Sequence, residues 1–177
     1  MPNMIYLVGK SPIPTRGRIG PEKAQDWYKM CVYVAKEYHQ NPGTLVLLIT
    51  GFSTADEGKE MDWYMNTLIM MGVSSNDMRL SPVGVETIKQ LETALPFSRI
   101  HYPNFTIVCT MFHFPRVRYL CWRMGLDAKF KVTYGWPRPA EAISDMILSV
   151  AFPFIDMLGL REKFLTFVKN RRAKGKV

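Results

Sequence analysis

A histidine and two arginines follow a short apolar run in the second half of the chain. After residues 105–109 the sequence reads T-M-F-H-F-P-R-V-R, which places His113, Arg116 and Arg118 close together. An imidazole exchanges protons near neutral pH, and a guanidinium binds phosphate or carboxylate through paired N–H groups. These residues predict a site for a small anionic molecule, in which His113 is the acid or base and Arg116 binds the negative charge.

The position of this segment supports the hypothesis. Residues 105–109 predict a strand buried on both faces, and Thr110 then lies at its carboxyl end, where ligands bind in open α/β sheets. Pro115 suits the first position of the next helix, because it has no amide hydrogen. Arg116 and Arg118 would fall in the first turn, where each cation is unfavourable by roughly 0.3–1 kcal/mol unless an anion is near. We therefore expect a negatively charged group beside them.

A second set of polar residues follows the first expected strand, residues 4–8. Residues 10–21 are rich in proline and glycine, which predicts a long irregular loop. Long loops within compact domains are often functional, although their charges can also simply be solvated. The candidate ligand-binding residues in this loop are Gly9, Lys10, Arg16 and Arg18.

Alternating strands and helices are expected to position these residues. Apolar runs predict strands at 4–8, 44–50, 77–80, 105–109 and 129–133. Helical spacing predicts helices at about 21–38, 54–71, 85–99, from 115, from 139 and at 160–170, with a bend or break at Pro96. This alternation is typical of a three-layer, Rossmann-like α/β fold with about five mainly parallel strands. In the order 3-2-1-4-5, the first loop and the His113 turn would flank one crevice.

Two further candidates lie near helix starts. Glu57 follows Thr54 by three residues, which predicts a capping box, and a catalytic or ribose-binding role is the alternative. Thr87 could cap the next helix or contact a ligand. The sequence leaves both alternatives open.

Several of these positions together resemble a known family. Glu57-x-x-x-Met61, Met71-Gly72-Val73, Ser81, Glu86-Thr87 and V-C-T-M-F-H-F-P-R-V-R are similar to motifs of the SanA/ElyC/YdcF family, a domain of largely unknown function. The likeness extends from the first strand to the helix after Pro139, and the H-x-x-R turn is its most specific part.

The resemblance implies a Rossmann-like fold and transfers motif positions to Glu57, Thr87, His113, Arg116 and Arg18. One family member is linked to S-adenosylmethionine binding, and membrane-anchored members to envelope integrity. Where the family motif reads N-T-x-E-N, this chain has Glu86, Lys89 and Gln90. These departures favour a binding module without turnover as the alternative to an enzyme.

Composition limits the other classes of function. With 177 residues and 47% hydrophobic content, the chain predicts one globular domain at 1–168 and a basic tail at 169–177. The tail carries much of the net charge of +8, so we expect weak contact with anionic lipid there but no specific nucleic-acid binding. The apolar stretch at 144–160 is interrupted by Asp145, Pro153 and Asp156 and predicts a core helix rather than a membrane span.

The cysteines and histidines add two expectations. Cys31, Cys109 and Cys121 each lie in apolar surroundings, which predicts buried, reduced thiols and a cytoplasmic location. The three histidines show no metal-ligand spacing, so no metal is expected. The sequence thus predicts an enzyme, a hydrolase or transferase, acting on a phosphorylated or nucleotide-like ligand. The alternative is a module that binds a nucleotide or S-adenosylmethionine without catalysis.

Overall fold

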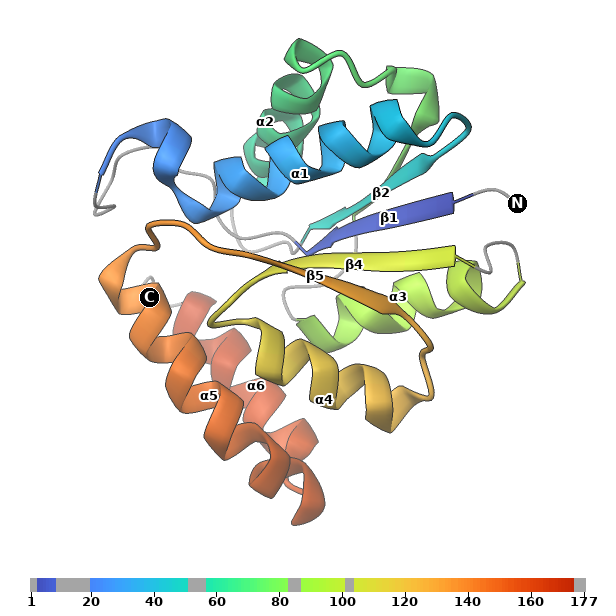
Figure 1. Cartoon of the computed structure of the whole chain (residues 1–177). Coiled ribbons are helices and arrows are strands. Elements are labelled where there is room, and N and C mark those ends of the chain that lie inside the picture. The colour runs from blue at the N-terminus through green and yellow to red at the C-terminus, as the bar shows by residue number, and fades with distance from the viewer. Residues whose placement is uncertain (1–2, 9–19, 51–56, 83–86, 101–103, 174–177) are drawn as a thin grey trace.

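The computed structural model describes residues 3–8, 20–50, 57–82, 87–100 and 104–173. Among these residues five strands form one all-parallel sheet in the order β3-β2-β1-β4-β5 (Figure 1). The strands are β1 (Asn3–Val8), β2 (Leu45–Thr50), β3 (Met78–Pro82), β4 (Asn104–Thr110) and β5 (Lys129–Thr133). The predicted fold class and strand order are confirmed.

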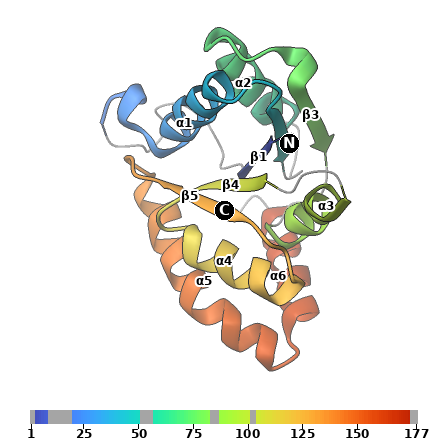
Figure 2. The ribbon, with the colours of Figure 1, turned by 45° about the vertical axis from the view of Figure 1, so that its right-hand side comes forward.

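Helices cover both faces of the sheet (Figures 1 and 2). On one face lie α1 (Asp26–Gln40) and α2 (Glu57–Met70), and on the other lie α3 (Thr87–Ile100) and α4 (Phe114–Met124). Beyond α4, away from the sheet, lie α5 (Pro139–Met157) and α6 (Arg161–Ala173). Two short 3₁₀ helices, η1 (Glu22–Ala24) and η2 (Ser75–Asp77), precede α1 and β3.

The two-residue period of the strands creates two cores. In β1, Met4, Tyr6 and Val8 face α3 and α4, whereas Ile5 and Leu7 face α1 and α2. All five side chains are buried. The expectation that residues 105–109 form a strand covered on both faces is confirmed, because β4 contributes buried side chains to both cores, as β1 and β2 also do.

Several predicted element boundaries were wrong by a few residues. The first long helix begins at Asp26, because η1 occupies the segment after Pro21. Pro115 takes the second helical position rather than the first, so Arg118 falls beyond the first turn. Helix α3 continues through Pro96 to Ile100, so of the predicted bend or break the break does not occur. The last helix extends to Ala173, so the basic segment from Lys169 is helical at its start.

Helix α5 is oriented differently from the prediction of a core helix. Its apolar stripe faces outward, and the exposed members are Ile143, Met146, Ile147, Val150, Phe154 and Leu158. The inward side carries Asp145 and Phe152, which are buried against the rest of the molecule. No helix in the described parts of the chain has the length and apolar content needed to cross a membrane.

The loop after β5 is fixed to the start of α1. The Trp136 amide donates a hydrogen bond to the Ala24 carbonyl at 2.9 Å, and Gln25 and Trp136 form an isolated parallel bridge. A Cβ at Gly135 would lie 2.6 Å from the backbone N and Cα of Asp26. Only glycine therefore fits at this close approach.

The three cysteines are free and buried, as predicted. Burial raises the pKa of the Cys121 thiol to about 12 and also raises that of Cys31. Both thiols therefore stay protonated at neutral pH, which makes them poor nucleophiles.

Candidate functional site

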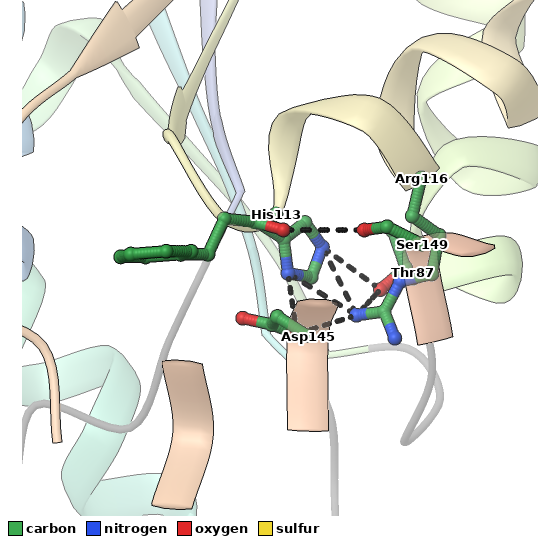
Figure 3. Close-up of polar contacts among 6 residues, drawn as sticks. Thr87, His113, Arg116, Asp145 and Ser149 are labelled. Carbon is green, nitrogen blue, oxygen red and sulfur yellow. Dashed lines mark hydrogen bonds and ion pairs between the residues drawn. The ribbon is translucent and has the colours of Figure 1, made fainter. Parts of the chain in front are cut away.

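His113 lies in the turn that joins β4 to α4. Its amide donates to the Thr110 carbonyl at 3.1 Å, which closes the turn directly after the strand. The residue occupies the N-cap position of α4 in a helical conformation, but its side chain makes no capping hydrogen bond. The imidazole therefore does not cap the helix. Figure 3 shows the ring lying among Thr87, Arg116 and Asp145 instead.

Three side chains, one from each of three helices, meet at this ring. Thr87, the first residue of α3, places its Oγ1 at 3.1 Å from His113 Nε2. Asp145 of α5 places Oδ1 at 3.4 Å from His113 Nδ1. Arg116 of α4 places Nη2 at 3.2 Å from Asp145 Oδ1 and at 3.1 Å from His113 Nδ1. The Thr87 hydroxyl, the His113 imidazole and the Asp145 carboxylate thus contact one another in that order, with the Arg116 guanidinium beside them.

The carboxylate of Asp145 changes the electrostatic argument made from the sequence. Arg116 was expected to require a negatively charged guest near the start of α4. Asp145 supplies a negative charge from within the chain, so the position of Arg116 by itself does not demand an external anion. A ligand that bound Arg116 would have to compete with this carboxylate or share the guanidinium with it.

Which ring nitrogen of His113 carries the proton depends on the two neighbours of Nδ1, Asp145 and Arg116. If Nδ1 carries hydrogen, it can donate to Asp145, and Nε2 can then accept from the Thr87 hydroxyl. If Nδ1 is bare, it can accept from Arg116 instead, and Nε2–H donates to Thr87. The first arrangement makes His113 a base toward a hydroxyl, with Nδ1–H 3.1 Å from Arg116 Nη2, which is also a donor; the second arrangement satisfies this shorter contact. The 3.4 Å separation from Asp145 is long for a hydrogen bond.

The site is shielded and held by packing. The side chains of His113, Asp145 and Arg116 are 7%, 11% and 13% exposed. One turn along α5 from Asp145, the Ser149 hydroxyl donates to the Phe112 carbonyl at 3.2 Å (Figure 3). This bond ties the turn before His113 to the helix that carries Asp145, so the imidazole and the carboxylate are positioned together.

Thr110 lies on the other side of the same turn. It is buried, and its Oγ1 has no hydrogen-bond partner among the described residues. It lines a recess of about 50 Å³ at the carboxyl ends of β4 and β5, together with Asp26, Met111, Phe112, Thr133, Tyr134, Gly135 and Pro137. This volume suits a water molecule or one small group of a ligand rather than a whole nucleotide.

The structure brings together three of the residues singled out from the sequence: Thr87, His113 and Arg116. Thr110 is close in the chain, but its side chain faces the separate recess. The predicted loop residues Gly9, Lys10, Arg16 and Arg18 lie outside the described residues. Glu57 begins α2, and its side chain also lies outside what is described.

Asp145 and Ser149 were not identified as site residues from the sequence. The available signal was an acid within the most apolar helix, a position where a buried charge requires a partner.

No protein-family model, curated protein or solved structure matches this chain. Within the described residues, no group of three or more His, Cys, Asp and Glu side chains is arranged to hold a metal ion.

Proposed function

We propose that this protein is an enzyme, a hydrolase or transferase, acting on a small phosphorylated or nucleotide-like molecule at the carboxyl end of β4. The observation that carries the proposal is the contact series from Thr87 Oγ1 through the His113 ring to Asp145 Oδ1. A hydroxyl, a base and a group that orients the base are the elements of an activated nucleophile. In this role Nε2 of His113 takes the proton of the Thr87 hydroxyl, and Asp145 stabilises the resulting imidazolium.

The location in the sheet supports this proposal. The order β3-β2-β1-β4-β5 reverses direction between β1 and β4, and His113 directly follows β4. Ligands of open α/β proteins bind at this topological switch point. Arg116 would bind the negative charge of the substrate while remaining in contact with Asp145, since a guanidinium has several donors.

The resemblance to the SanA/ElyC/YdcF family gains support from the same cluster. Its motif positions Thr87, His113 and Arg116 come from two separate segments of the sequence, yet their side chains are in contact. We propose membership of this family on that basis. Binding of a nucleotide or S-adenosylmethionine without turnover is the second candidate, favoured by the departures at Glu86 and Lys89.

A thermal-shift screen tests ligand binding. Nucleotides, S-adenosylmethionine and sugar phosphates are added to the wild type, to Arg116→Lys and to Arg118→Ala. Arg116→Lys retains a positive charge near Asp145 but loses the planar fork, so it should lose ligand stabilisation. Arg118 is an exposed residue of the same helix, and Arg118→Ala should respond as the wild type does. If no compound stabilises the wild type, both candidate functions are refuted.

Product formation then distinguishes the two candidates. A compound that stabilises the protein is incubated with the wild type, His113→Gln and His39→Gln. His39 contacts the Met71 carbonyl on another part of the molecule, and its replacement should leave turnover unchanged. Turnover by the wild type that is lost only in His113→Gln supports the enzyme. Binding without any product supports the module without catalysis.

The expected contact between the basic tail and anionic lipid remains a separate proposal. Helix α6 continues to Ala173, so Lys169, Arg171 and Arg172 lie on the helix rather than in an extended tail. Truncation before Lys169 should abolish co-sedimentation with anionic vesicles if the tail makes this contact. Unchanged co-sedimentation of the truncated chain would refute it.

A further inference from the structure

Helix α5 presents to solvent the side that a surface helix normally buries. Its exposed apolar stripe consists of Ile143, Met146, Ile147, Val150, Phe154, Met157 and Leu158, which are 55% to 72% exposed. The opposite side carries Asp145, Ser149 and Asp156, which contact α4 or the turn before it. The helix is thus amphipathic with its apolar side outward, and such contiguous exposed surfaces mark interaction sites.

The spacing within the stripe is that of a helix-packing seam. Ile143, Ile147, Val150, Phe154 and Met157 follow one another at intervals of four, three, four and three residues. This alternation keeps one line of side chains facing a partner helix, as in the a and d positions of a coiled coil. Any amphipathic helix has this spacing, so it fits a partner helix, and the choice between a helix and lipid rests on the charges.

The charges favour the same type of partner. Helices that lie on anionic membranes carry Lys or Arg beside their apolar side, and residues 139–157 contain neither. Of the three acids in this helix, Asp145 and Asp156 are turned inward and paired with Arg116 and Arg123. The stripe is therefore electrically neutral and does not repel an identical stripe.

The area of the stripe matches what a stable dimer requires. Its seven side chains, each more than half exposed, offer together on the order of 800 Å², which is the area each partner buries in a standard interface. Two identical stripes related by a two-fold axis cover each other and leave no open end for further growth. We propose that this protein forms a symmetric homodimer in which α5 packs against α5 of a second copy.

The mass in solution tests this proposal on the full chain. Light scattering should give twice the 20.4 kDa of one chain, and Ile147→Glu should give one chain with unchanged circular dichroism. The matched control is Ile69→Glu, which places the same substitution at an exposed isoleucine of α2, across the sheet. The control should remain dimeric. A wild-type mass of one chain at concentrations up to about 100 μM would overturn the proposal, since a Kd above that value is weak for this area.

A cross-linking experiment gives an answer even if Ile147→Glu does not fold. Val150 lies at the middle of the stripe, so it would face its counterpart near the two-fold axis. Cys31, Cys109 and Cys121 are buried, so a short bis-maleimide should react mainly at Val150→Cys and produce a covalent dimer, whereas Ile69→Cys should not. Equal cross-linking of both variants would contradict the proposed interface. So would a monomeric wild type that co-sediments with vesicles and loses this binding in Ile147→Glu, because lipid would then cover the stripe.

Discussion

Replacing Asp145 by Asn tests whether the cluster around His113 depends on a buried charge. Asp145 Oδ1 lies 3.2 Å from Arg116 Nη2, and both side chains are largely buried. At this distance, with an effective dielectric constant of about 20, their attraction is about 5 kcal/mol. Asparagine keeps the shape and one acceptor, so part of the interaction survives. We expect Asp145→Asn to lower the free energy of unfolding by about 2–4 kcal/mol, because Arg116 loses its carboxylate in a poorly solvated place.

The matched control for this substitution is Asp156→Asn. Asp156 lies on the same helix and contacts Arg123 of α4 at 3.1 Å, but the Arg123 side chain is 52% exposed. Asp156 is itself only 7% exposed, but water screens its exposed partner Arg123, and asparagine can still accept the 2.9 Å hydrogen bond from the Tyr119 hydroxyl, so Asp156→Asn should destabilise the protein less. Urea unfolding followed by circular dichroism gives the free energy of unfolding of both variants. In thermal unfolding, Asp145→Asn should lower the melting temperature by roughly 5–15 °C. Equal midpoints for the two variants would refute the assignment of a strong, buried charge pair at Asp145.

Three more predictions concern the surroundings of the site. Gly135→Ala should destabilise the protein by about 1–3 kcal/mol in urea unfolding, because its Cβ would meet the backbone of Asp26, and an unchanged midpoint would contradict that packing. Ser149→Ala should cost about 0.5–1.5 kcal/mol by removing the bond to Phe112, and it should also reduce turnover if the turn positions His113. The pKa of Cys121 is raised from 9.0 to about 12, so its contribution to stability is complete below pH 9. As the pH rises toward 12, the unfolded thiol ionises first, and the free energy of unfolding should fall by about 1.4 kcal/mol per pH unit more in the wild type than in Cys121→Ala. An equal pH dependence of the free energy of unfolding in these two proteins would show that burial does not raise the pKa of the Cys121 thiol.

The sheet could be predicted because its signals are local and repeat in every unit. Residues 105–109 are continuously apolar, which indicates a strand covered on both sides, and each such run is followed by a helix. Parallel pairing and right-handed crossovers then leave few strand orders. The turn at His113 was identified for the same reason, since polar residues directly after a buried strand lie at the edge where ligands bind.

Asp145 and the orientation of α5 could not be predicted in this way. Apolar periodicity shows which residues of α5 share a side, but it does not show which side turns toward the rest of the molecule. That choice depends on contacts between distant segments, such as the one between Asp145 and Arg116, 29 residues apart. The stripe from Ile143 to Leu158 was therefore assigned to the core, although the side that carries Asp145 is the buried one.

Helix α5 has one further consequence, because its two sides serve different contacts. Its inner side carries Asp145 beside the His113 imidazole, and the outward residues Met146 and Ile147 follow directly in the chain. The surface proposed to bind a second copy and the carboxylate that contacts His113 therefore belong to one helix, and a substitution on either side of it can be checked for its effect on the other.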